Sequence, residues 1–193
     1  MGSAFNHFGH HNPPVDMQFL PMLLAEEMPS VGIEVGCFVG QVTSLLAQYC
    51  KSVLAVDTFQ GTVASGEYAS PVDVLRTFCE NLGELVPEIV HPLVGQSHIW
   101  ASVLKPVEAG IVVIDGCHDF HRACQDMKVW WPHLKEGGLM VVHDFYVFNT
   151  VNKALRWAFG EGYANVAQRD VQSARIPLGG GKYLPTTWAM IRK

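Results

Sequence analysis

Residues Val31 to Ala47, which read VGIEVGCFVGQVTSLLA, decide the fold of this chain. The first five residues form a short apolar run, which is typical of a buried strand, and the apolar spacing after Gly40 indicates a helix. Two glycines, Gly36 and Gly40, lie between them. Glycine has no Cβ and readily adopts positive φ, and the N–H groups of the following helix point back at the turn. A ligand could therefore lie close against this backbone.

The glycine pattern by itself leaves two interpretations open. Glu34 stands at the carboxyl end of the strand, where a carboxylate can accept hydrogen bonds from ligand hydroxyls or an amine. A dinucleotide-binding turn would read GxGxxG, but Phe38 stands where one of its glycines belongs, which weakens a pyrophosphate site. A turn with a purely structural role is equally consistent with this glycine pattern. The remaining sequence is needed to distinguish it from a ligand-binding turn.

Composition excludes several classes of protein. The chain has 193 residues, of which 49% are hydrophobic and 16% charged, as in one globular domain. The net charge of −5 and the lack of a basic run argue against a nucleic-acid partner. The apolar runs are too short for a membrane span, and the first residues do not resemble a signal peptide. Without a CxxC pair, the five cysteines indicate reduced thiols, so we expect a cytoplasmic protein.

Alternating strand and helix patterns follow the glycine turn. We expect residues 1–14 to be a flexible end and residues 15–193 to form one domain. The apolar runs predict strands at 52–57, 88–94, 109–115 and 139–144, with a turn at 135–138 and two closing strands around Gly179 to Gly181. Helical spacing predicts helices at 15–28, 70–82, 99–104, 120–133 and 149–159.

Acidic residues follow three of these strands. Asp57 lies about 20 residues past the glycine turn, where a Rossmann-like fold holds the ribose hydroxyls of a nucleoside; a helix N-cap is the alternative. Asp115 and the pair His143-Asp144 end later strands. The carboxyl edge of a parallel sheet is where α/β proteins bind ligands.

This order of elements and acids resembles the class I S-adenosylmethionine-dependent methyltransferases over about residues 15–193. The segments 114–120 and 134–145 carry the strongest likeness, which is to small O-methyltransferases of the cephalosporin-hydroxylase-like, macrocin-type and catechol-type branches. The resemblance implies a Rossmann-like α/β fold. Its sheet would have seven mostly parallel strands with a C-terminal antiparallel hairpin, and helices would cover both faces.

The resemblance also implies S-adenosylmethionine as cofactor. Asp57 would hold the ribose, and Thr58 and Phe59 would border the adenine. The full set of cofactor-binding residues that it implies is Glu34, Gly36, Phe38, Gly40, Asp57, Thr58, Phe59, Gly95, Gln96, Ser97 and Asp115.

Two histidines are candidate catalytic bases. In catechol-type relatives a lysine three positions past the strand-end aspartate is the base, and here that residue is His118. His143 is the alternative, with Asp144 as a catalytic partner. The same relatives imply a divalent metal on Asp115, His143 and Asp144. Because Mg²⁺ prefers oxygen ligands, a His-Asp pair leaves metal dependence open.

The acceptor is expected to be a hydroxyl of a small molecule or sugar. Methyltransferases of nucleic-acid bases carry Asn/Asp-Pro-Pro-Tyr where this chain reads Asp-Gly-Cys-His from Asp115. Two other functions stay open: a metal-dependent hydrolase or oxygenase using His118, His143 and Asp144, and a protein that binds S-adenosylmethionine without turnover. Contacts in a homo-oligomer could close the site.

Overall fold

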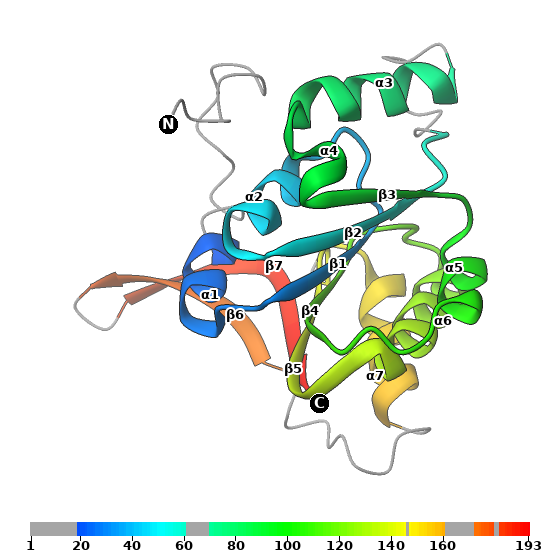
Figure 1. Ribbon diagram of the computed structural model, residues 1–193. Coiled ribbons are helices and arrows are strands. Elements are labelled where there is room, and N and C mark those ends of the chain that lie inside the picture. The colour runs from blue at the N-terminus through cyan, green and yellow to red at the C-terminus, as the bar shows by residue number, and fades with distance from the viewer. Residues whose placement is uncertain (1–18, 61–69, 146, 161–171, 180–181) are drawn as a thin grey trace.

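A computed structural model describes residues 19–60, 70–145, 147–160, 172–179 and 182–193 (Figure 1). The described strands form one seven-stranded sheet in the order β3-β2-β1-β4-β5-β7-β6. The first five strands pair in parallel, whereas β7 runs antiparallel to both β5 and β6. The Rossmann-like sheet and its C-terminal hairpin are therefore confirmed.

Strands and helices alternate along the chain until the final hairpin. The strands are β1 Val31–Val35, β2 Ser52–Asp57, β3 Val90–Val94, β4 Ala109–Ile114, β5 Leu134–Val142, β6 Gln172–Gly179 and β7 Lys182–Arg192. The helices are α1 Phe19–Glu27, α2 Gln41–Tyr49, α3 Pro71–Leu82, α4 Leu85–Glu88, α5 Ser97–Val103, α6 Phe120–Trp130 and α7 Asn149–Gly160, with a 3₁₀ turn at Trp131–His133.

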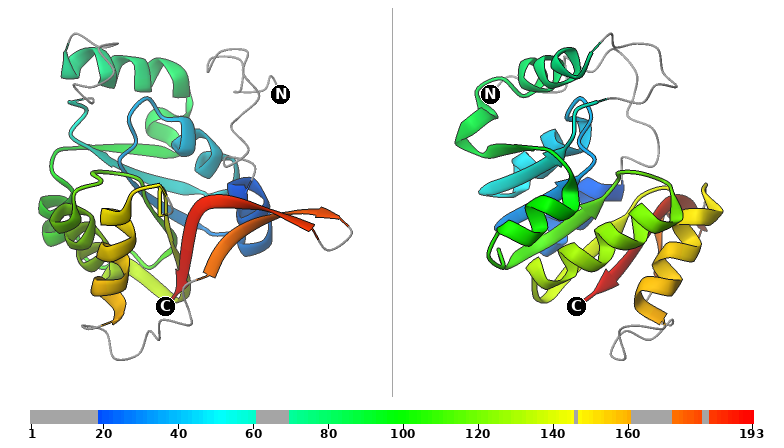
Figure 2. Two further views of the ribbon diagram at one scale, coloured as in Figure 1. Left: turned by 180° about the vertical axis from the view of Figure 1, so that it is seen from behind. Right: turned by 90° about the vertical axis from the view of Figure 1, so that its right-hand side faces the viewer.

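Two apolar cores lie on opposite faces of the sheet. Helices α1, α2 and α3 pack with one core, and α5, α6 and α7 pack with the other, as Figure 2 shows from two sides. Alternation along β4 divides its side chains: Ile111 and Val113 join the first core, Val112 and Ile114 the second. All four are buried, which explains why this strand reads as an uninterrupted β-branched run.

The strand order reverses at β1, which lies between β2 and β4. Chain connections leave such a point in opposite directions, and the carboxyl ends of the strands open a crevice there. The β1 turn and the residues after β4 touch through their backbones. Gly36 has φ +91°, and a Cβ on it would overlap the Asp115 carbonyl and lie 2.5 Å from Gly116 Cα.

Some predicted boundaries were wrong. The predicted turn at 135–138 lies inside β5, where the pairing with β4 shifts register between Ala109 and Ile111. A bulge absorbs the glycines without ending the strand. The helix predicted to reach His133 ends at Trp130, because the Pro132 ring disfavours further α-helix and a 3₁₀ turn follows. Residues 1–18, which hold the predicted flexible end, lie outside the described part.

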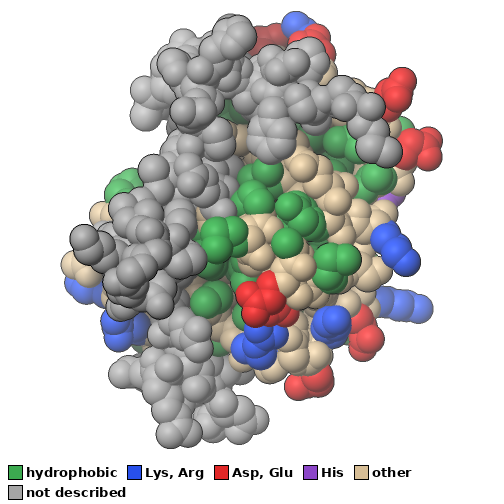
Figure 3. Space-filling model, turned by 90° about the vertical axis from the view of Figure 1, so that its left-hand side faces the viewer, with side chains coloured by type: hydrophobic (Ala, Val, Ile, Leu, Met, Phe, Trp, Pro, Cys, Tyr) green, Lys and Arg blue, Asp and Glu red, His purple; other side chains and the backbone are tan. Residues whose placement is uncertain are grey.

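One face of the molecule exposes apolar side chains. Figure 3, which looks at the left-hand side of Figure 1, shows them gathered in the middle of that face. Met22 and Met28, on α1 and just after it, are 47% and 71% exposed. The expected homo-oligomer stays a prediction. None of the helices in the described ranges is long and apolar enough to cross a membrane.

Replacing Gly36 with alanine tests the contact between β1 and β4. The variant should lose about 1–2 kcal/mol from positive φ and about 1–3 kcal/mol more from the overlap with Asp115. Gly137 is the matched control, because it also has positive φ, +73°, but nothing within 4 Å of a Cβ. Urea unfolding should show a larger loss for G36A than for G137A. Equal losses would contradict the contact.

Candidate active site

The Asp57 carboxylate holds the glycine turn in place. Its Oδ2 accepts a hydrogen bond from the Phe38 backbone N–H at 2.8 Å, and its Oδ1 accepts one from the Phe59 N–H at 2.7 Å. Phe38 has φ +46°, a left-handed conformation that glycine would adopt more easily. The carboxylate therefore stabilises a glycine-like turn where the sequence lacks the third glycine.

Glu34 lies beneath the turn and does not face the ligand cavity. It is 1% exposed, and its Oε2 accepts a hydrogen bond from the Thr43 hydroxyl on α2. Burial raises the pKa of Glu34 well above its ordinary value, the Thr43 hydrogen bond opposes this, and the charges of Asp115 and Asp57 raise it further. Glu34 thus ties β1 to α2.

A cavity of about 340 Å³ opens at the carboxyl ends of β1 to β4. Its position agrees with the ligand crevice expected at the reversal of strand order. Six of the predicted cofactor residues line it: Gly36, Asp57, Thr58, Gly95, Gln96 and Ser97. The other lining residues are Val35, Val56, His98, Gly116, Cys117, Arg122, Gln125 and Asp126.

Five predicted cofactor residues do not line the cavity: Glu34, Phe38, Gly40, Phe59 and Asp115. Phe59 was expected beside the adenine, but its ring is 1% exposed and packs edge-on against Phe78 at 5.1 Å. Only its backbone N–H serves the site. A Cβ on Gly40 would lie 3.1 Å from Phe78, so this glycine allows α3 to pack against the turn.

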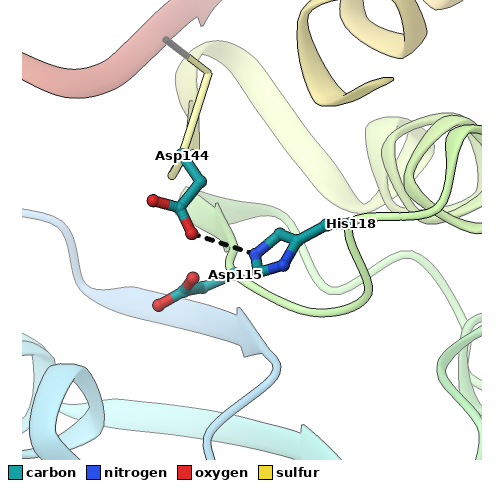
Figure 4. Close-up of side chains that lie close together, drawn as sticks. All are labelled: Asp115, His118 and Asp144. Carbon is teal, nitrogen blue, oxygen red and sulfur yellow. Dashed lines mark ion pairs between the residues drawn. The ribbon is translucent and has the colours of Figure 1, made fainter. Parts of the chain in front are cut away.

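Three polar side chains converge beside the cavity: Asp115 after β4, His118 in the next loop, and Asp144 after β5. Figure 4 shows them pointing toward one another. One potential ligand atom from each lies within 4.8 Å of the others. Gly116 and Cys117, which line the cavity, separate Asp115 from His118 in the chain. The cluster and the cavity therefore share one loop.

The His118 Nε2 atom is shielded from solvent, yet it has no hydrogen-bond partner among the residues that the structure describes. It lies 3.0 Å from Asp144 Oδ2, but in a direction that does not make a hydrogen bond. The ring stacks on Phe148 with centroids 4.2 Å apart and planes 10° apart. Both the Val147 and Phe148 N–H groups donate to the Asp144 carbonyl, so the turn that carries Asp144 also orients His118.

The role of His143 as a metal ligand stays a prediction. The three-residue group contains His118 in its stead. His143 Nδ1 lies 2.9 Å from Asp115 Oδ1 and 3.5 Å from Asp144 Oδ2, and its ring packs on the buried Trp188 at 4.2 Å. His143 is thus placed to orient the Asp115 carboxylate.

Four polar cavity residues were not identified from the sequence as site residues: His98, Arg122, Gln125 and Asp126. Arg122, Gln125 and Asp126 have the i, i+3, i+4 spacing of one helix face, which was the available signal. Burial raises the pKa of Asp126 to about 6, although Ser97, His98 and Arg122 oppose the shift. Cys117 also lines the cavity, and its free thiol is exposed.

The sequence matches the family described as "Methyltransferase domain" over residues 33–145, the part of the chain that contains the turn, the cavity and the cluster. The chain belongs to this family. With the strand order above, it is a class I S-adenosylmethionine-dependent methyltransferase. This membership decides for methyl transfer over the hydrolase or oxygenase alternative. No curated protein matches the sequence.

Solved methyltransferases share the fold at low sequence identity. An O-methyltransferase from Bacillus cereus in complex with SAH has a TM-score of 0.62 at 15% identity, covering 96% of this chain and 84% of that one. CalS11, a TDP-rhamnose 3'-O-methyltransferase of calicheamicin biosynthesis, has a TM-score of 0.56 at 16% identity, and the match covers 91% of this chain and 79% of that one. An rRNA methylase from Streptococcus thermophilus has a TM-score of 0.60 at 17% identity, and the match covers 95% of this chain and 99% of that one.

The buried Glu34 makes stability depend on pH. Its native pKa is raised above 4.5, so the folded state holds this proton more tightly than the unfolded chain. The free energy of unfolding therefore falls as pH rises from 4.5 through the raised pKa, with a slope of about 1.4 kcal/mol per pH unit between the two pKa values. Glutamine can still accept the Thr43 hydrogen bond without this charge.

Urea unfolding should therefore give similar stabilities for wild type and Glu34→Gln near pH 4, and greater stability for the variant at pH 8. The difference between the two proteins is the quantity to measure, because other groups titrate equally in both. A difference that does not change with pH would contradict the buried, raised-pKa carboxyl.

Proposed function

We propose that this protein transfers a methyl group from S-adenosylmethionine to a hydroxyl of a small molecule. The observation that carries the proposal is the cluster of Asp115, His118 and Asp144 on the loop that borders the nucleoside-sized cavity. Methyl transfer to a hydroxyl oxygen needs a group beside the methyl donor that removes the hydroxyl proton or weakens the O–H bond. The cluster supplies carboxylates and an imidazole at that position.

In this proposal the cavity residues position the cofactor. Gly36 gives close backbone approach, and Asp57 has lone pairs left for the ribose hydroxyls after accepting its two backbone hydrogen bonds. Gly95 and Gln96 border the adenine. The bound cofactor supplies an electrophilic methyl on a sulfonium, so orienting it in line with the acceptor accounts for much of the rate.

The cluster fits a divalent cation. The solvent-shielded His118 Nε2 lacks a hydrogen-bond partner in the described part of the chain, and a cation held with Asp115 and Asp144 would satisfy it. A mixed set of imidazole and carboxylates suits Mn²⁺, Fe²⁺ or Zn²⁺ better than Mg²⁺. Such an ion would polarise the acceptor hydroxyl as a Lewis acid. The His143 ring, whose Nδ1 lies 2.9 Å from Asp115 Oδ1, would orient the Asp115 carboxylate, because carboxylates that bind metals are usually held by a second hydrogen-bonding group.

Without a metal, His118 is the proposed base. Its Nε2 accepts the hydroxyl proton, and Asp144 Oδ2 at 3.0 Å stabilises the imidazolium that forms. The stacked Phe148 ring keeps the imidazole in one orientation. The two arrangements use the same nitrogen and therefore exclude each other, so metal titration separates them.

The acceptor is proposed to be a small molecule. The net charge of −5 disfavours a nucleic-acid backbone. Phe148, which stacks on His118, is 39% exposed, and Val147, its neighbour in the chain, is 57% exposed, so apolar surface is available to a substrate. Among the structures with this fold, CalS11 is a TDP-rhamnose 3'-O-methyltransferase, which supports a hydroxyl acceptor in this class of protein.

Removing the His118 imidazole should weaken metal binding, because Asp115 and Asp144 then remain as the two candidate ligands. In calorimetry, Mn²⁺ should bind wild type more tightly than Mg²⁺, and His118→Ala should weaken Mn²⁺ about tenfold or more. His121→Ala is the matched control, because His121 is an exposed histidine outside the cluster. If wild type binds no divalent ion and methyl transfer survives chelation, the metal is excluded and His118 is the base.

Replacing the Asp57 carboxylate should weaken cofactor binding without unfolding the chain. Asp57→Asn removes acceptor capacity and charge, so calorimetry should show about a tenfold or greater loss of affinity for S-adenosylhomocysteine. Glu80→Gln, an exposed charge change on α3, should bind as wild type does. Absence of binding to wild type would reject the proposed function; binding without turnover on a broad hydroxyl panel would favour a non-catalytic role.

A further inference from the structure

The Asp126 carboxyl on α6 forms part of the cavity wall and has no assigned role in cofactor binding or methyl transfer. The residue is 8% exposed and lines the cavity. A Cβ built on Gly116 would lie 3.5 Å from Asp126 Oδ2, so the carboxyl faces the loop after β4. The Ser97 hydroxyl, which accepts the Trp130 indole N–H at 2.7 Å, is its side-chain hydrogen-bond partner.

Few protein groups stabilise this carboxylate. A carboxylate can accept about four hydrogen bonds, and burial without enough donors disfavours its charge. Burial raises the pKa of Asp126 to about 6; the Ser97 hydrogen bond and the charges of His98 and Arg122 compensate only in part. A ligand that brings an N–H donor into the cavity would supply what the protein lacks.

The two carboxyls that line the cavity come from different elements. Asp57 stands at the end of β2, and its two oxygens already hold the glycine turn. Asp126 approaches from α6, next to Ser97 at the start of α5. Gln96, Ser97 and Asp126 line the same cavity as Asp57, so a nucleoside whose ribose lies on Asp57 would have these side chains available to its base.

We propose that Asp126 reads the base of the cofactor by accepting a hydrogen bond from the 6-amino group of adenine. This inference rests on the proposed function, because it assumes a bound adenosyl group. Adenine offers N–H donors at position 6, whereas hypoxanthine offers a carbonyl oxygen there. A carboxylate attracts the first and repels the second, so one side chain selects between the two bases.

The test compares two nucleosides that differ at this position: S-adenosylhomocysteine and S-inosylhomocysteine. Calorimetry on wild type at pH 7.5 should show about tenfold or greater preference for the adenosyl compound. In Asp126→Asn the amide can accept from an amino group or donate to a carbonyl, so the preference should shrink to within about threefold.

Asp57→Asn is the matched control. This variant changes another carboxyl that lines the cavity, the one proposed to bind the ribose. It should therefore weaken the binding of both compounds equally and keep the preference for the adenosyl compound. The wild-type comparison needs no variant, so the inference stays testable even if Asp126→Asn fails to fold.

Three results would overturn the inference. Equal affinity of wild type for both compounds would refute base reading by Asp126 while leaving the proposed methyl transfer intact. An unchanged preference in a folded Asp126→Asn would move base recognition to another residue. Failure of wild type to bind either compound would reject the proposed function and this inference together.

Discussion

The hydrogen bonds from the Phe38 and Phe59 amides to the Asp57 carboxylate are the interaction on which the site depends. They fix the end of β2 to the turn after β1, and the Gly36 N–H donates to the Val56 carbonyl at 2.9 Å in the same region. On the other side, the Asp115 N–H donates to the Val35 carbonyl at 2.8 Å. The central turn is therefore held between both neighbouring strands, and the cavity has a rigid floor.

This construction gathers negative charge at one edge of the sheet. Glu34 lies near the end of β1, and Asp57 and Asp115 lie at the ends of the two neighbouring strands. Burial is the main cause of the raised pKa of Glu34, and the charges of Asp115 and Asp57 raise it further. Such repulsion costs stability unless something positive compensates it. A sulfonium and a divalent ion are both cations. The negative potential of the carboxylates at this edge would therefore favour the binding of both proposed ligands.

Sequence patterns predicted the central strands of this fold because these strands are short apolar runs, and an acid lies at the end of β2 and just after β4. They also indicated that Asp57 and Gly36 lie at the ligand edge of the sheet, and both residues line the cavity there. They could not tell where the Phe59 ring points, since an aromatic residue at the end of a strand can turn either into the cavity or into the core, and here it packs against Phe78. His118, rather than His143, lies in the cluster with Asp115 and Asp144. This depends on the geometry of the turns after β4 and β5, which the spacing of residues along the sequence does not determine.

The loop from Asp115 to His118 joins the two halves of the proposed reaction. Its first residue contacts the glycine turn through backbone atoms and presents its side chain to the cluster. Gly116 and Cys117 line the cavity, and Asp126 packs against Gly116 from α6. His118, which closes the loop, is held by Phe148. These four residues therefore contact the glycine turn, the cavity and the cluster, so a displacement of this loop would alter the proposed cofactor binding and the proposed hydroxyl activation together.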